Sequence, residues 1–117
     1  MSLQPCLSVV IPTRNRRRAL AETLEALDAQ RSLPGPLEVI VAVDGSSDDT
    51  LKWLAVARFS GFGLEVLALD AGGPARARNR GVDRARAKRV LLQFSVTAPY
   101  SVFKLQGRLN RKWILAG

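Results

Sequence analysis

Residues 7–16 read LSVVIPTRNR, and this stretch decides how the chain begins to fold. It opens with an apolar, largely β-branched run that Pro12 closes, which is typical of a strand buried on both faces of a parallel sheet. Asn15 can cap a helix that follows. The helix itself is predicted by buried-type residues at helical spacing, namely Leu20, Thr23, Leu24 and Leu27. The stretch therefore predicts a buried strand that leads into an amphipathic helix.

The same alternation continues outward from this first unit. Further strands are predicted at residues 37–43 (LEVIVAV), 64–69 (LEVLAL) and 89–94 (RVLLQF). The helices between them begin after cap residues, at Ser46-Ser47-Asp48 and at Gly72-Gly73-Pro74. In the last helix small side chains share one face, at Ala77, Gly81, Val82 and Ala85. Because a β-α-β-α-β-α-β order requires right-handed crossovers, we predict an α/β fold, a Rossmann-like three-layer domain with a mostly parallel sheet.

Composition limits the classes of protein that need to be considered. The 117 residues, with 47% hydrophobic and 24% charged content, suit one globular domain. The single cysteine, Cys6, and the lack of histidine exclude an internal disulfide and the usual zinc sites. No apolar run reaches the roughly 20 residues that cross a bilayer, and no secretory leader is recognisable. These features predict a cytoplasmic location.

Candidate site residues follow the strands, because ligands of open parallel sheets bind beyond the carboxyl ends of the strands. The sequence contains neither G-x-G-x-x-G nor a P-loop, so a nucleotide would have to be held differently. Asp44 could accept a hydrogen bond from a base N–H, and the Thr13 hydroxyl could bond the ribose or the base. The alternative is that Asp44 and Gly45 simply form a turn and Thr13 simply ends a strand.

Three motifs in order resemble those of family 2 glycosyltransferases. They are LSVVIPTRNR (7–16), VAVDGSSDDT (41–50) and GPARARNRG (73–81), and the resemblance covers residues 7–94. It implies a GT-A fold that binds a nucleotide-diphosphate sugar, often a UDP-sugar, and passes the sugar to an acceptor hydroxyl with inversion.

Residue by residue, the resemblance implies a donor nucleotide-binding site. Thr13 and Asp44 would contact the nucleoside, and Arg78 would approach the base or the phosphates, as suits a guanidinium. Arg16 is a further candidate near this cradle. Asp48 and Asp49 match an acidic pair of the family motif, and we interpret them as residues that start a helix.

The chain departs from the family pattern after the fourth predicted strand. There the family carries a D-x-D or D-D motif that holds Mg²⁺ or Mn²⁺ against the diphosphate, whereas this chain has Ser95-Val96-Thr97. The carboxylate that serves the family as catalytic base is also missing, since residues 84–117 contain no Asp or Glu. We therefore predict no metal ligands and no catalytic residues in this chain, and no turnover by the chain alone.

The net charge of +8 divides the sequence into two regions. Residues 1–83 hold ten basic and ten acidic side chains, whereas residues 84–117 hold eight basic ones. We predict a nucleotide-sugar-binding domain at 1–94 and a basic tail at 95–117, the tail being a truncation joined to unrelated or frame-shifted residues.

Two alternatives concern this basic end. Residues 102–113 could instead form a native basic amphipathic helix that touches an anionic membrane surface or a partner, or covers the edge of the sheet, or pairs with a second copy in a homodimer. The competing function is a non-catalytic module that binds nucleic acid or membrane through its basic end. The neutral first 83 residues argue against nucleic acid as a partner.

Overall fold

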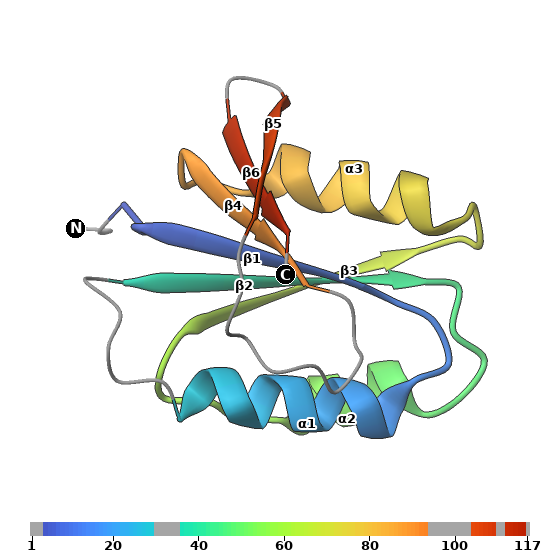
Figure 1. Cartoon of the computed structure of the whole chain (residues 1–117). Helices are drawn as coiled ribbons and strands as arrows, with labels where there is room; N and C mark the ends of the chain where they lie inside the picture. Colours follow the sequence, from blue (N-terminus) through green and yellow to red (C-terminus); the bar gives the residue numbers. More distant parts are fainter. Residues whose placement is uncertain (1–3, 30–35, 94–103, 110–111, 117) are drawn as a thin grey trace.

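The computed structural model describes residues 4–29, 36–93, 104–109 and 112–116 of the chain. Strands and helices alternate through residue 92, as the sequence predicts, and two further strands follow (Figure 1). The elements are β1 (Leu7–Thr13), α1 (Arg17–Asp28), β2 (Leu37–Asp44), α2 (Thr50–Val56), β3 (Gly63–Leu69), α3 (Pro74–Arg84), β4 (Arg89–Leu92), β5 (Lys104–Leu109) and β6 (Lys112–Ala116).

One six-stranded sheet with the order β3-β2-β1-β4-β6-β5 organises the domain. β1 pairs in parallel with β2 on one side and with β4 on the other, and β6 adds in parallel to β4. β5 pairs antiparallel with β6. The chain therefore moves outward from β1 through β2 to β3 and then returns to the opposite side of β1. This confirms the predicted Rossmann-like, mostly parallel α/β fold and places the topological switch point between β1 and β4.

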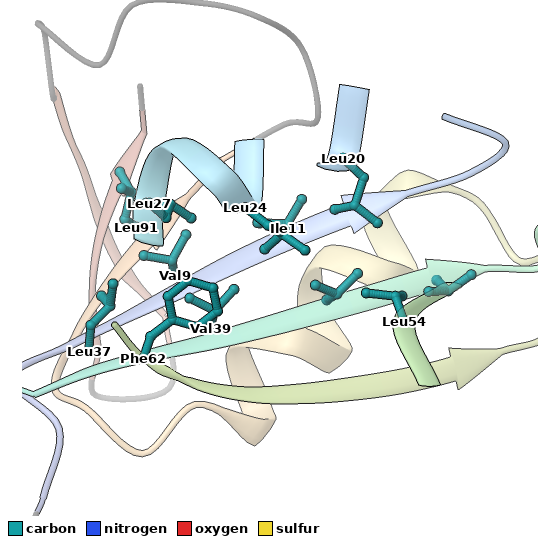
Figure 2. Close-up of a cluster of buried hydrophobic side chains, with 12 residues drawn as sticks. Val9, Ile11, Leu20, Leu24, Leu27, Leu37, Val39, Leu54, Phe62 and Leu91 are labelled. Atoms are coloured by element: carbon teal, nitrogen blue, oxygen red, sulfur yellow. The ribbon is translucent and has the colours of Figure 1, made fainter. Parts of the chain in front are cut away.

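Helices cover both faces of the sheet, α1 and α2 on one and α3 on the other (Figure 1). Because successive strand residues point to opposite faces, β1 contributes to both cores. Val9 and Ile11 pack with the leucines of α1, as Figure 2 shows, and Val10 packs with Val82 of α3. Every residue predicted for the inner face of the first helix is buried, at Leu20, Thr23, Leu24 and Leu27.

The start of α1 differs from the sequence-based prediction. Asn15 is not its cap, because the helix begins at Arg17 with Arg16 at the N-cap position and no side-chain cap. The second helix starts closer to expectation. The Asp48 carboxylate accepts hydrogen bonds from the backbone N–H and the hydroxyl of Thr50. The hydroxyl bond is the main cause that lowers the pKa of Asp48.

The alternative prediction of an amphipathic helix at residues 102–113 is wrong, because β5 and β6 occupy most of that range. Apolar residues in this segment also fit the spacing of strands, and pairing with β4 decides between the two patterns. The origin of residues 95–117 stays a prediction. Within the part of the chain that the structure describes, no helix is long and apolar enough to span a membrane.

The close approach of α3 to the sheet depends on Gly81. Ala77, Gly81 and Val82 are buried, as the small-residue face of the helix predicts. A Cβ atom built on Gly81 would lie 2.3 Å from Cγ1 of Val10 in β1. The missing side chain therefore sets the distance between α3 and β1.

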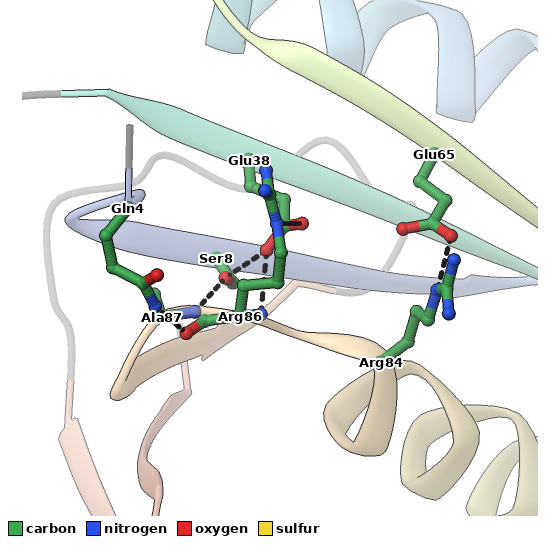
Figure 3. A network of polar contacts seen from close by, with 7 residues as sticks. All are labelled: Gln4, Ser8, Glu38, Glu65, Arg84, Arg86 and Ala87. Carbon is green, nitrogen blue, oxygen red and sulfur yellow. Dashed lines mark hydrogen bonds and ion pairs between the residues drawn. The ribbon is translucent and has the colours of Figure 1, made fainter. Parts of the chain in front are cut away.

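A buried polar network lies at the amino ends of β1 and β2 (Figure 3). Ser8 Oγ donates to Glu38 Oε2 at 2.6 Å, and Arg86 donates its backbone N–H to Oε2 and its Nε–H to Oε1, each at 3.0 Å. The Ala87 N–H donates to Ser8 Oγ at 3.1 Å. Burial raises the pKa of the Glu38 carboxyl, but the hydrogen bonds and the charge of Arg86 outweigh burial, so this pKa is lowered overall. The network ties β1 and β2 to the segment that leads into β4.

We predict that Gly81→Ala destabilises the domain by about 1–3 kcal/mol, because the added methyl overlaps Val10 in a packed core. Elsewhere in a helix the same change stabilises by up to about 1 kcal/mol. In a Val10→Ala background the clash is gone, so the sign of the effect should reverse. Urea unfolding of the four proteins of this cycle measures the effect. Equal effects in both backgrounds would contradict the close approach.

We also predict that Glu38→Gln lowers the free energy of unfolding at pH 7 by about 2 kcal/mol, because hydrogen bonds to a charged acceptor are weakened. Since the folded-state pKa of Glu38 is lowered, its contribution is complete above the ordinary glutamate range and is lost as the pH falls through the lowered pKa. The difference between wild type and variant should therefore shrink in acid.

The control for this prediction is Glu65→Gln. Glu65 pairs with Arg84 at the surface, where ion pairs contribute about 1 kcal/mol or less. Denaturant unfolding over a pH series measures both variants. A pH-independent difference for Glu38→Gln, or an equal loss in the control, would show that the charge of Glu38 does not stabilise the fold.

Candidate functional site

Two of the predicted site residues lie side by side at the carboxyl edge of the sheet. Thr13 is the last residue of β1 and Asp44 the last residue of β2, and the register pairs Thr13 with Val43. Both side chains are largely buried, with 5% and 4% of their surface exposed. The two residues therefore end neighbouring strands, 31 residues apart in sequence, next to the switch point of the sheet, and strand alternation directs their side chains to opposite faces of it.

Asp44 is fixed by the loop that follows β3. Its Oδ1 accepts a hydrogen bond from the Gly72 N–H at 2.8 Å, and the neighbouring Gly45 N–H donates to the Leu69 carbonyl at 2.9 Å. Gly45 has a φ of +66°, and a Cβ atom there would lie 2.7 Å from the Ala71 nitrogen. The chain thus bends at Gly45, where the Asp-Gly pair predicts a change of direction. The bend also orients the carboxylate, so the two interpretations of Asp44 are compatible.

Asn15 belongs to the same edge, and reasoning from the sequence assigned it the wrong role. Its Oδ1 accepts hydrogen bonds from the backbone N–H groups of Ser47 and Asp48, at 2.8 and 3.2 Å. Its own N–H donates to Ser46 Oγ at 2.9 Å. The residue has a φ of 52°, a left-handed conformation that asparagine tolerates better than most residues. The tolerance of asparagine for a left-handed backbone is the one signal in the sequence that Asn15 could do something other than cap a helix.

The two predicted arginines lie on the helices that start from this edge. Arg16 is exposed at the N-cap position of α1, and Arg78 is half-buried near the start of α3. Among the described residues, no ion pair joins either arginine to Asp44. Both arginines stand near the starts of helices that follow β1 and β3, at the edge where those strands end.

The carboxyl edge carries positive charge where a helix dipole favours negative charge. Neither α1 nor α3 has an acidic residue in its first turn. Exposed or half-buried arginines surround both helix starts instead, at Arg14, Arg16, Arg17, Arg18, Arg76, Arg78 and Arg80. Of these, Arg17 pairs with Asp49 at 3.5 Å and lies over the Trp53 ring. The edge thus combines a buried acceptor with basic groups that suit an anion.

The residues present do not fit the carboxylate-held metal that the family resemblance implies. Asp48 is engaged with Thr50, and Asp49 pairs with Arg17. Over the described ranges no group of three Asp, Glu, His or Cys side chains could hold an ion. Beyond Asp83 the sequence has no carboxylate side chain at all. The chemistry that this edge offers is hydrogen bonding and cationic contact.

Known proteins that this chain resembles in sequence are glycosyltransferases. Residues 8–93 match the model of the family described as glycosyl transferase family 2. Validoxylamine A glucosyltransferase of Streptomyces hygroscopicus subsp. limoneus is 52% identical over 46 residues, which are 39% of this chain and 10% of that protein. The poly(ribitol-phosphate) β-N-acetylglucosaminyltransferase TarS of Staphylococcus aureus is 34% identical over 86 residues, which are 72% of this chain and 15% of TarS.

Solved structures agree with the sequence comparison. The crystal structure of S. aureus TarS 1–349 superposes with a TM-score of 0.63 at 31% identity, over 76% of this chain and 27% of that one. The same TarS fragment in complex with UDP-GlcNAc gives a TM-score of 0.65 at 33% identity, over 76% and 26% of the two chains. The chain therefore spans about a quarter or less of these relatives. With its α/β fold and the match over residues 8–93, the chain belongs to glycosyl transferase family 2.

Proposed function

We propose that this chain binds the nucleotide of a nucleotide-diphosphate sugar, with a UDP-sugar favoured, at the carboxyl ends of β1 and β2. The observation that carries the proposal is the buried Asp44 carboxylate, which the Gly72 N–H holds at the end of β2, the strand next to the one that Thr13 ends. The similarity to a TarS fragment in complex with UDP-GlcNAc supports the choice of nucleotide.

The proposed contacts use each group for the chemistry that it offers. Asp44 spends Oδ1 on the Gly72 N–H, and its Oδ2 would accept from a base N–H. The Thr13 hydroxyl would bond the ribose or the base. Arg78, with Arg16 as a second donor, would contact the diphosphate through charge-assisted hydrogen bonds. In the family the bound sugar is then passed to an acceptor hydroxyl with inversion. The proposed contacts do not specify which acceptor this is.

We further propose that this 117-residue chain binds its donor without transferring the sugar. Transfer in the family uses carboxylates that hold a metal and one that removes the proton of the acceptor hydroxyl. None lies in residues 84–117, where the family pattern places the metal-binding ones. Nucleotide binding by this chain should accordingly be independent of a divalent metal.

The location in the cell and the assembly state are separate expectations. A cytoplasmic location, contact with a membrane surface and pairing of two copies stay predictions from the sequence. Sizing by light scattering tests the pairing.

We predict that UDP binds to the chain with the same affinity in Mn²⁺ and in EDTA, and that Asp44→Ala weakens this binding about tenfold or more. Loss of a hydrogen bond to a charged group corresponds to about 1.5–3 kcal/mol. Titration calorimetry with UDP and GDP measures the affinities, and thermal unfolding confirms that the variant is folded.

Two further variants sharpen this experiment. Asp44→Asn can still accept from the Gly72 N–H but lacks the charge, so it separates the loop contact from the base contact. Asp70→Ala removes an exposed carboxylate from the same edge and leaves in place the backbone carbonyl of residue 70, to which Arg76 donates at 3.2 Å. The control should bind UDP as wild type does. Binding that survives in Asp44→Ala, or the lack of any nucleotide binding in the wild type, would refute the proposed site.

A further inference from the structure

We propose that Asn15 is a positioning residue for the donor site, which locks the loop after β1 onto the loop after β2. This inference rests on the proposed function, because it concerns how Thr13 and Asp44 are kept in one cradle. Asn15 itself is not assigned a contact with the nucleotide.

The lock consists of hydrogen bonds between segments more than 30 residues apart in sequence. The Asn15 side-chain oxygen accepts from Ser47 N at 2.8 Å and from Asp48 N at 3.2 Å, and Ser47 Oγ lies 3.3 Å from the same oxygen. In the other direction the Asn15 N–H donates to Ser46 Oγ at 2.9 Å. One residue of the first loop therefore makes reciprocal bonds with three consecutive residues of the second.

Position along the chain gives this lock its effect on the site. Asn15 follows Thr13 by two residues, and Ser46 follows Asp44 by two residues. β1 and β2 are in register up to these strand ends, where the last ladder pair is Thr13 with Val43. Beyond the last ladder pair, the hydrogen bonds of Asn15 replace the inter-strand hydrogen bonds and keep the two loops together.

Two properties of the asparagine are needed together. The backbone at φ 52° disfavours most side chains, although glycine and asparagine adopt it. The carboxamide oxygen must also reach two backbone N–H groups that precede α2. Glycine would satisfy only the first requirement, alanine neither, and aspartate both. The substitutions thus separate the conformation of the backbone from the bonds of the side chain.

The lock continues into the third loop. Asp44 accepts from Gly72 N, and the Gly45 N–H donates to the Leu69 carbonyl, so the loops after β1, β2 and β3 are joined in a row. A ligand that contacts residues of all three loops then binds to an arrangement that is already ordered. If the bonds of Asn15 between the first two loops were lost, binding would also have to meet the entropic cost of ordering these loops.

The chain offers a matched control at the other end of the sheet. The side chain of Asp28, the last residue of α1, accepts from the Gly61 N–H at 2.6 Å. Like Asn15, Asp28 uses a side-chain oxygen to bind a distant backbone N–H, here 33 residues along the chain, and it ties the end of α1 to a loop. Asp28→Ala should therefore lower the melting temperature as loss of a structural tie does, without touching the carboxyl edge.

The experiment measures UDP affinity by titration calorimetry, and melting temperature, for the whole chain with Asn15→Gly, Asn15→Asp and Asp28→Ala. We expect Asn15→Gly to weaken UDP binding about tenfold, which equals about 1.4 kcal/mol. Asn15→Asp should retain an affinity within about threefold of wild type, and Asp28→Ala should bind UDP as wild type does. If Asn15→Gly fails to fold, Ser46→Ala, which removes the acceptor of the Asn15 N–H, replaces it with an expected loss of about threefold.

The outcomes separate this inference from the function on which it rests. If wild type binds UDP and the Asn15→Gly or Ser46→Ala chain binds equally well, the positioning role is wrong and the donor site stands. The role is also wrong if Asp28→Ala weakens binding as much, because the effect then follows general stability. If wild type binds no UDP, the proposed function is wrong and the positioning role falls with it.

Discussion

The burial of β1 on both faces and along both edges is the constraint on which the rest of the domain depends. Every residue from Ser8 to Thr13 is buried, and the backbone pairs with β2 on one side and with β4 on the other. Such a strand has to be covered by helices on both faces, and its neighbours have to run parallel to it, because each crossover returns the chain over the sheet. One face of β1 is covered by α3, which approaches closely at Gly81, and the other face is covered by the leucines of α1.

The two ends of this central strand resolve their polar groups in opposite ways. At the amino end, Ser8, Glu38 and Arg86 satisfy one another, so a carboxylate can remain charged in a buried position. At the carboxyl end, Asp44 is held by a backbone N–H, while the surrounding arginines lie at the surface. A network closed on itself stabilises a fold. At the carboxyl edge Arg17 pairs with Asp49, while other arginines such as Arg16 lie exposed and could contact an anion, which is why we propose the binding site there.

The charge at this edge also bears on the departure from the family pattern. A diphosphate requires positive charge nearby, and the family supplies part of it as a metal held by carboxylates. Here the residues after β4 contain no carboxylates, and arginines stand at the starts of α1 and α3. Guanidinium groups can bind phosphate oxygens by themselves, but they do not hold a metal. The proposed donor binding therefore relies on guanidinium groups rather than on a metal.

The sequence by itself determined the order of strands and helices through residue 92 and the inner faces of α1 and α3. It also placed Thr13 and Asp44 next to the carboxyl ends of their strands, although β1 continues through Pro12, where the strand was expected to close. These follow from local periodicity, turn residues and the geometry of parallel sheets, all of which act over a few residues. Only the tertiary structure decided the partners of Asn15 and Glu38 and the need for glycine at position 45, since each depends on groups about 25 to 50 residues away. It also decided that residues 104–109 and 112–116, whose local pattern fits a helix as well as a strand, form β-strands, because β4 offers an open edge with which β6 pairs.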